Sequence, residues 1–392
     1  MTASKPLDEL VNLDYAASAP LRPEALAAMA AYDASPYAGA NPNSLHSLGR
    51  AAAAALEGAR RDVARSLGRR VRPSEVVFTG GGTEANVIAL EGMALGARGR
   101  DSRRSRVIVS ALEHDSILDN VPALKRAGFV VDVLDATSAG TVSLERLEAL
   151  MGADVALVSV MLANNETGAV QPLRDVVRIA HAAGALVHTD AIQGYLHVPF
   201  DPAELGVDAA SMAGHKVGAP ASIGALYVRS RTPLVPLSHG GGQELGIRPG
   251  TQDVRSALAF AAVARALAPR VADAQDAVRA RSDEMYRRLL ASPRIEATLP
   301  DPYAQVRLPG IVSITVAGLE SEELILRLDA AGFEVSAASA CSSGSLDASH
   351  VLTAMGIPRD RALGSLRVSF DDRVPADALG RFCDALLEIA GA

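Results

Sequence analysis

Lysine is rare in this chain, and one lysine stands where its amine could do chemistry. Of the 38 basic residues only three are Lys (Lys5, Lys125 and Lys216), and the rest are Arg. Lys216 lies in a loop between two expected strands, with Gly214 and Gly218 on either side. A lysine amine that is removed from water can lose its proton and form an imine with a carbonyl compound, which a guanidinium cannot do. The alternative interpretation is an ordinary surface lysine.

Polar side chains also follow several other expected strands, at the points where those strands end. They are His114 after VIVS, Asn164, Asn165 and Glu166 after VALVSVM, and Asp190 and Gln193 after ALVHT. In an open α/β sheet, ligands bind in the crevice beyond the carboxyl ends of the strands. We therefore expect these groups along one rim of a binding site, although a single His or Asp at such a position is more often a capping or structural group.

A run of glycines follows the expected strand VVFT and leads into a helix, as GGGTEAN (80–86). Backbone N–H groups at a helix N-terminus bind phosphate, and the Thr83 hydroxyl would add a donor. By itself such a run is also typical of an ordinary turn. A phosphate site, the Lys216 amine and the Asp190 carboxylate together fit pyridoxal phosphate, an aldehyde whose ring absorbs carbanion charge when its nitrogen stays protonated. No CxxC or HExxH pattern occurs, so we predict no metal site.

The elements that would position these groups alternate along the chain. Short β-branched runs predict strands at 76–78, 107–109, 130–134, 155–161, 185–188 and 223–228, and helical spacing predicts helices at 83–97, 115–127, 143–151 and 173–183. This alternation is typical of an α/β domain with a largely parallel sheet. A long helical stretch over about 252–292 leads to a second unit, with expected strands near 311–316 and 366–370 and expected helices near 321–331 and 376–390.

The composition is that of a soluble globular protein of about two or three structural units, with 392 residues, 49% hydrophobic and 21% charged. The net charge of −7 gives no indication that the chain as a whole binds nucleic acid or an anionic membrane. No apolar run reaches the ~18 residues of a spanning helix, and the N-terminus lacks the apolar core of a signal peptide. Two cysteines exclude a disulfide framework and favour a reducing cytoplasm. The Arg-rich segments 59–72 and 98–106 are expected to be solvated surface, or alternatively a docking patch for an acidic partner.

The motifs, their order and their spacing resemble those of the cysteine desulfurases, the IscS/NifS-like branch of the class V aminotransferase group. The resemblance covers nearly the whole chain and rests on LDYAASAPLRP (13–23), NPNSLH (41–46), GGGTEAN, ALEHDS, NNETGAVQP, HTDAIQ, GHK, HGGGQELGIRPGT (239–251), SACSSGSLDASHVL (339–352) and SLRVSF (365–370). It implies an α/β fold, that of the fold type I pyridoxal-phosphate transferases. We expect a large domain at 13–258 with a mixed, mostly parallel seven-stranded sheet. A smaller C-terminal α+β domain would comprise 1–12 and 259–392.

The resemblance also implies roles for individual residues around the cofactor. Lys216 would form the imine, Asp190 would pair with the ring nitrogen, and His114 would stack on the ring and act as an acid and base. Asn165 and Gln193 would hold the oxygen substituents of the cofactor. The groups expected to hold the phosphate are Gly82, Thr83, His215 and Thr251, with Thr251 reaching the site of the neighbouring subunit of a homodimer.

For the substrate, the resemblance implies Arg367 as the group that binds the α-carboxylate, Asn165 as a further substrate-binding group and Cys341 as the nucleophile. The alternative interpretation of Cys341 is a small buried apolar residue. This does not fit the surrounding sequence SAASACSSGSLD, which has no large apolar side chain before Leu346. Cys383 lies in an amphipathic helical pattern, where we expect simple packing. The implied reaction removes sulfur from L-cysteine, leaving L-alanine and a persulfide on Cys341 that passes to an acceptor protein, as in iron–sulfur cluster assembly.

Three segments depart from the usual pattern of the family. Ala213 replaces a Ser, which removes one hydroxyl from the expected phosphate site. GAPASIG (218–224) and SAASAC (336–341) replace more usual versions, and the second change bears on the choice of acceptor. Two other functions stay open: another class V enzyme (a selenocysteine lyase, another C–S lyase or a transaminase) and a non-catalytic scaffold. The sequence does not identify the acceptor.

Overall fold

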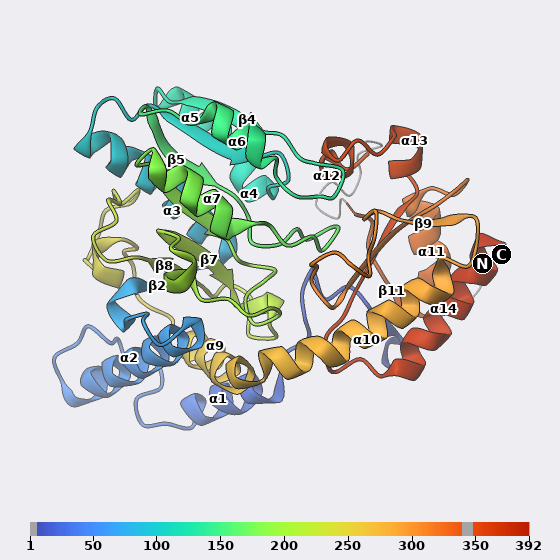
Figure 1. Ribbon diagram of the computed structural model, residues 1–392. Coiled ribbons are helices and arrows are strands. Elements are labelled where there is room, and N and C mark those ends of the chain that lie inside the picture. Colours follow the sequence, from blue (N-terminus) through green and yellow to red (C-terminus); the bar gives the residue numbers. More distant parts are fainter. Residues whose placement is uncertain (1–5, 339–347, 392) are drawn as a thin grey trace.

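The computed structural model describes residues 6–338 and 348–391 and has a seven-stranded sheet at its centre (Figure 1). The strands are β2 (Val76–Thr79), β3 (Arg106–Ser110), β4 (Val130–Leu134), β5 (Val155–Ser159), β6 (Leu186–Asp190), β7 (Ala209–Ala213) and β8 (Gly224–Val228), in the order β2-β8-β7-β6-β5-β3-β4. Strand β8 is antiparallel to both neighbours and the other pairs are parallel. The expected mixed, mostly parallel sheet is therefore confirmed.

Strand β7 carries the weakest strand signal of the seven. Its sequence, AASMA, has no β-branched residue, whereas the six predicted β-branched runs correspond to the other six strands. All five residues of β7 are buried between β6 and β8. Its conformation is therefore set by pairing on both sides rather than by intrinsic preference.

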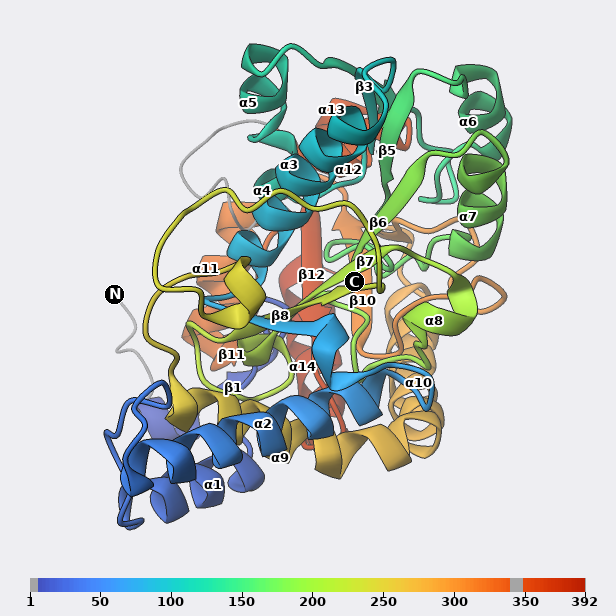
Figure 2. The ribbon, with the colours of Figure 1, turned by 90° about the vertical axis from the view of Figure 1, so that its left-hand side faces the viewer.

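Helices cover both faces of the sheet, because successive residues of each strand point to opposite faces. One core contains Val107 and Val109 with the apolar side of α3 (Gly82–Arg100). The other contains Ile108 with residues of α2 (Ser47–Leu67), α7 (Leu173–Ala182) and α9 (Val254–Leu267). The remaining helices of this part are α1 (Pro23–Asp33), α4 (Asp115–Leu118), α5 (Val121–Arg126), α6 (Leu144–Leu150) and α8 (Pro202–Leu205). Figure 2 shows α1, α2 and α9 side by side along one edge.

Two predicted helices are each divided into two. The stretch 115–127 forms α4 and α5, and Pro122 stands in the first turn of α5, where a missing N–H does no harm. The stretch 252–292 forms α9 and α10 (Val271–Leu289), separated by a short 3-10 turn at Ala268–Arg270 that contains Pro269. Because proline cannot donate within a continuous helix, the axis breaks there.

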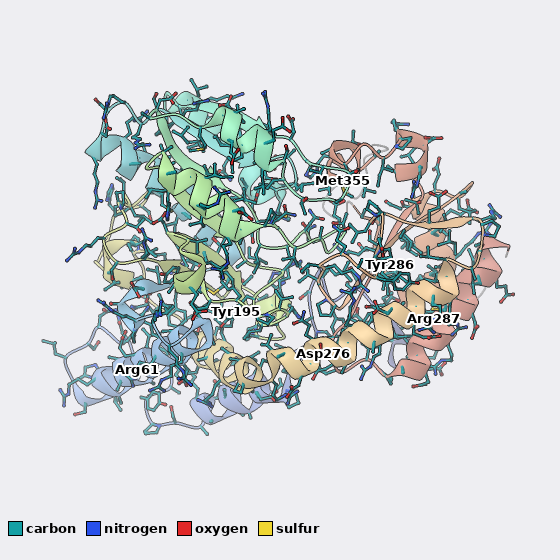
Figure 3. The ribbon with its side chains drawn as sticks, viewed as in Figure 1. Arg61, Tyr195, Asp276, Tyr286, Arg287 and Met355 are labelled. Carbon is teal, nitrogen blue, oxygen red and sulfur yellow. The ribbon has the colours of Figure 1, made fainter. Side chains whose placement is uncertain are left out.

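The C-terminal part has its own sheet and its own core. Strands β12 (Ser365–Ser369), β10 (Ile311–Val316) and β9 (Ile295–Ala297) form an antiparallel sheet in that order, and β1 (Val11–Asn12) pairs in parallel with β11 (Phe333–Glu334). The helices are α10, α11 (Ser321–Ala331), α12 (His350–Ala354), α13 (Arg359–Ala362) and α14 (Ala376–Ala390). In Figure 3, Tyr195 marks the first core and Tyr286 the second. Cys383 is buried in the second core, as expected.

The separation of the cores bears on the division into domains. We propose the domains 13–258, and 1–12 with 259–392, as approximate bounds. The side chain of Leu13 packs in the second core, and α9 continues in the first core as far as Leu267.

None of the helices in the described ranges combines the length and the apolar character that a membrane crossing requires.

Candidate active site

A cavity of about 490 Å³ lies where β3, β5, β6 and β7 end, and residues that end or follow these strands line it. Of the residues singled out in the sequence, those that line it are Gly82, Thr83, His114, Asn165, Asp190, Gln193, His215, Lys216 and Arg367. Thr251 is exposed and is not among the lining residues. Cys341 lies outside the described residues, while Ala338 and Ala348, on either side of it in the chain, both line the cavity.

Lys216 ends a short 3-10 turn that follows β7 directly and is a lining residue rather than a fully exposed surface lysine. Its Nζ atom donates to the carbonyl oxygens of Ala16 (2.7 Å) and Ala17 (2.8 Å). The neighbouring glycines are required by space: a Cβ on Gly214 would stand 2.7 Å from the Ile223 side chain. The backbone therefore passes close to its neighbours here while the amine reaches the cavity.

Asp190 is the last residue of β6 and places a buried carboxylate in the cavity. Its Oδ1 accepts from the backbone N–H of Ile192 (2.9 Å) and its Oδ2 from the side chain of Asn86 (2.7 Å). Burial raises the pKa of Asp190, and these hydrogen bonds and the charges of His114 and Lys216 act against that rise. A cationic ring nitrogen placed beside the carboxylate would favour its charged form further.

His114 is the N-cap residue of α4, and its ring is fixed by the start of that helix. The Nδ1 atom accepts from the backbone N–H of Ser116 (3.0 Å) and lies 3.0 Å from the Ser116 hydroxyl. Because the lone pair of Nδ1 is used in this way, the neutral ring carries its proton on Nε2.

The N-terminus of α3 has the features of an anion site. The N-cap residue Gly81 has no side chain and a φ of 146°, a conformation that favours glycine. A Cβ on Gly82 would stand 2.3 Å from the Ile192 side chain, so the chain needs glycine there too. Thr83 and His215 also line this region, and burial lowers the pKa of His215 to about 4, so at neutral pH it is a hydrogen-bonding group rather than a cation. Ala213, the departure noted in the sequence, is buried at the same wall.

Arg367 comes from β12 and brings a buried guanidinium from the second core to the cavity. Its Nη1 donates to the backbone oxygen of Asn165 (3.0 Å), and its Nη2 donates to Asp14 Oδ1 (2.7 Å). Its Nε has no hydrogen-bond partner among the described residues. A buried donor without a partner costs free energy, so this atom is suited to an incoming acceptor such as a carboxylate. Gln193 donates to the Ala16 oxygen (2.9 Å).

Comparison with known proteins decides the family. The family model described as Aminotransferase class-V matches residues 11–379. The chain belongs to the class-V aminotransferase family. The resemblance found in the sequence is thereby confirmed.

Individual relatives agree with this assignment. An IscS-like cysteine desulfurase of Mycobacterium tuberculosis is 40% identical over 97% of this chain and 95% of its own length. The cysteine desulfurase NifS of Azotobacter vinelandii is 36% identical over 87% of this chain and 83% of its own. A solved structure described as a NifS-like protein superposes with a TM-score of 0.88 at 31% identity, covering 97% of this chain and 99% of the other.

Two buried carboxyl groups to which the sequence analysis assigned no role, Glu113 and Glu166, also line the cavity. Glu113 Oε1 accepts from the Met161 N–H (2.7 Å), and its Oε2 has no partner in the described parts of the chain. Burial and the charge of Asp190 raise the pKa of Glu113 well above its ordinary value. Glu166 was noted only as a polar group after a strand, and its Oε2 accepts from the Ser349 hydroxyl. Burial raises the pKa of Glu166 to about 7.

Sequence reasoning missed Glu113, Asn86, Asp14 and Ser349 for different reasons. Glu113 and Asn86 lie inside quoted motifs, ALEHDS and GGGTEAN, so the rule of polar groups at strand ends and helix starts could have drawn attention to them. Asp14 meets Arg367 across 353 positions of sequence, and no spacing pattern predicts such a contact.

Proposed function

We propose that this protein is a cysteine desulfurase that uses pyridoxal phosphate. It would remove sulfur from L-cysteine, release L-alanine and carry the sulfur as a persulfide on Cys341. The observation that carries the proposal is the meeting of Lys216, Asp190 and the start of α3 with the guanidinium of Arg367 in one cavity. The names of the relatives support the same activity.

The residues present fit this cofactor. Gly81 faces open space at the start of α3 and so leaves room for a phosphate, with Thr83 and His215 as further donors. Asp190 would hold the ring nitrogen, and Lys216 would attach the cofactor. His114 would stack on its ring, and Asn165 and Gln193 would hold its oxygen substituents. When bound, pyridoxal phosphate supplies a ring that absorbs negative charge from the substrate Cα.

The chain's own groups would orient the substrate and move its protons. Arg367, held by Asp14 and the Asn165 carbonyl, would bind the α-carboxylate through its remaining donors. The Lys216 amine would take the Cα proton. The Cys341 thiolate would attack the substrate sulfur, and the Cβ–S bond would break with its electron pair passing to Cβ. Protonation of Cβ and return of a proton to Cα would leave alanine.

The molecular setting of the reaction is also a proposal. Thr251 is exposed on its own chain, which accords with a homodimer in which it completes the phosphate site of the partner subunit. The persulfide would pass to an acceptor protein in the cytoplasm, with iron–sulfur cluster assembly as the route that the names of relatives suggest. No direct contact with nucleic acid or membrane is part of the proposal.

The test is the fate of L-cysteine with the purified protein loaded with pyridoxal phosphate. We expect alanine and sulfur in equal amounts, a persulfide that a mass spectrum locates on Cys341, and loss of sulfur release in Cys341→Ala with the cofactor still bound. Undiminished release by Cys341→Ala would exclude the mechanism and favour another class-V activity. A wild-type protein that never gains the yellow band of the bound cofactor would favour a scaffold.

A further inference from the structure

The amide of Asn86, on α3, is fully buried behind the cavity and contacts two elements of the site. Its Nδ2 atom donates to Asp190 Oδ2 at 2.7 Å and to the Ser116 hydroxyl at 2.8 Å. Both amide hydrogens are therefore used, one toward the end of β6 and one toward the start of α4.

The first branch leads through Ser116 to His114. The Ser116 oxygen accepts from Asn86, so its own hydrogen is directed to His114 Nδ1, 3.0 Å away. The Ser116 backbone N–H donates to the same atom at 3.0 Å. With two donors aimed at it, Nδ1 has no room for a proton. The Ser116 N–H by itself makes Nδ1 an acceptor, and the Ser116 hydroxyl, oriented by Asn86, adds a second donor that strengthens the preference for the tautomer with the proton on Nε2.

The second branch determines where negative charge resides. Two carboxyl groups are buried here: Asp190 accepts from two N–H donors, whereas Glu113 accepts from one. Hydrogen bonds to a carboxylate favour its charged form, and two close carboxyl groups do not ionise equally. Without the Asn86 donor, the two groups would have one N–H donor each, and the preference for charge on Asp190 would be weakened to what the charges of His114 and Lys216 supply.

A purely structural role for Asn86, tying α3 to the sheet, is the simpler alternative. The other end of the amide speaks against it, because Asn86 Oδ1 is buried with no hydrogen-bond partner among the described residues. A buried unpaired carbonyl destabilises a fold, and an apolar side chain of similar size would avoid this penalty. The reverse orientation would place Oδ1 against the Asp190 carboxylate, where two acceptors repel. The arrangement is therefore explained by the donors that Asn86 supplies.

We propose that Asn86 is a positioning residue that supports two features of the site together: the negative charge on Asp190 and the Nε2-protonated tautomer of His114. The inference rests on the proposed function for what Asp190 and His114 do, but the hydrogen bonds themselves do not depend on it. Through this one amide, Asp190, expected beside the ring nitrogen, would keep its negative charge. His114, expected on the ring face, would keep its proton on Nε2.

The test compares three variants of the full-length protein loaded with pyridoxal phosphate. Asn86→Leu removes both donors, Ser116→Ala removes only the hydroxyl of the His114 branch, and Asn120→Ala is the control. Asn120 donates to the Ser116 carbonyl at 2.8 Å and touches neither Asp190 nor His114. The two readouts are the pH titration of the visible cofactor band and the ¹⁵N chemical shifts of the His114 ring, assigned with His114→Asn.

For Asn86→Leu we expect a shifted titration of the cofactor band, cofactor binding weaker by about tenfold, and altered shifts at His114 Nδ1. Ser116→Ala should alter the His114 shifts and leave the titration of the band as in wild type, and Asn120→Ala should change neither. An Asn86→Leu protein with both readouts unchanged would overturn the proposal. If this variant does not fold, Asn86→Ser decides, because one hydroxyl cannot donate to both partners and must change at least one readout.

A failure of this inference can be distinguished from a failure of the proposed function. If the wild-type protein binds no cofactor, the proposed function fails, yet the ring shifts in the cofactor-free protein still test the path from Asn86 through Ser116 to His114. Unchanged His114 shifts in both Asn86→Leu and Ser116→Ala would then count against the inference.

Discussion

The buried Glu166 carboxyl, which lines the cavity together with Arg367, makes stability depend on pH. Burial raises its pKa from 4.5 to about 7, although the Ser349 hydrogen bond and the charges of Arg367 and His114 oppose the rise and that of Asp115 adds to it. Because the folded-state pKa lies above the ordinary value, the fold favours the neutral form. The resulting stabilisation is fully present below pH 4.5 and is lost as the pH rises through about 7.

We therefore expect Glu166→Gln, which stays neutral at every pH, to remove this part of the pH dependence. Between pH 4.5 and 8 the wild type should lose up to about 3 kcal/mol of unfolding free energy relative to the variant. Urea unfolding at several pH values measures this difference. Glu145→Gln, on an exposed part of α6, is the control. Parallel pH curves for wild type and Glu166→Gln would contradict the assignment.

At the scale of single residues, the sequence predicted the members of the cavity better than their connections. Residue type and position after a strand were enough to select His114, Asp190 and Lys216, because parallel strands bring their carboxyl ends to one edge. The hydrogen-bond partners of these residues were not predicted. Asn86 and Ser116 matter through hydrogen bonds of 2.7–3.0 Å that depend on how α3 packs against the sheet, and no sequence spacing encodes that packing.

At the scale of elements, one buried ion pair holds the segment 239–251 against the sheet. Glu244 accepts from Arg60 of α2 at 2.6 and 2.8 Å, from the Phe78 N–H of β2 at 2.7 Å and from Gln252 at 3.1 Å. Glu244 and Leu245 both have positive φ, 48° and 61°. Non-glycine residues keep such conformations only where the surroundings impose them, so we infer that the ion pair holds this turn in place.

We expect Glu244→Ala to destabilise the protein by about 3–5 kcal/mol, because it removes the buried partner of Arg60 and leaves this buried charge with only the half-exposed Glu57. The double variant Arg60→Met/Glu244→Leu should lose much less, since it buries no charge. Urea unfolding measures both. Arg265→Ala, which removes a surface pair with Asp62, should lose less than about 1 kcal/mol. A double variant as unstable as the sum of its single variants would contradict this account.

The elements themselves were predictable where the chain has strong local signals. β-branched runs and helical spacing found six of the seven strands of the large sheet and the stretches that form α3 to α7 and α9. They missed α1, α2 and α8, and the expectation of solvated surface at 59–72 is wrong for Arg60, Val63 and Leu67, which are buried in α2. They did not show β7, whose alanines form a strand because β6 and β8 pair with it, nor the breaks before α5 and α10. Those features depend on tertiary pairing or on a single proline, to which averaged patterns are insensitive.

At the scale of the whole molecule, residues from both the part with the large sheet and the C-terminal part line the cavity. Most of its lining follows the strands of the large sheet, and Arg367 and Ser349 come from the C-terminal part. A segment near the N-terminus contacts the C-terminal part beside the cavity as well, because Asp14 pairs with Arg367 at 2.7 Å. The expected fold class follows from motif order, but this closure of the chain on itself is visible only in three dimensions.

Thr251 lies outside the cavity of its own chain, and this allows the proposed homodimer to be tested by complementation. A Lys216→Ala protein lacks the amine in its own site, and a Thr251→Ala protein should lower the cofactor affinity of its partner's site by about tenfold. In a mixed dimer, one site would then carry both lesions. The other would contain an intact Lys216 and receive an intact Thr251 from the partner subunit.

We therefore expect co-expressed, differently tagged Lys216→Ala and Thr251→Ala chains to form a mixed dimer in which one site binds pyridoxal phosphate with wild-type affinity. The visible cofactor band, titrated at limiting cofactor, measures this. If Thr251 served its own chain, both sites of the mixed dimer would be impaired and no wild-type phase would occur. The Thr251→Ala homodimer is the reference for the weak phase. A protein that is monomeric in light scattering and still binds the cofactor tightly would contradict the shared site altogether.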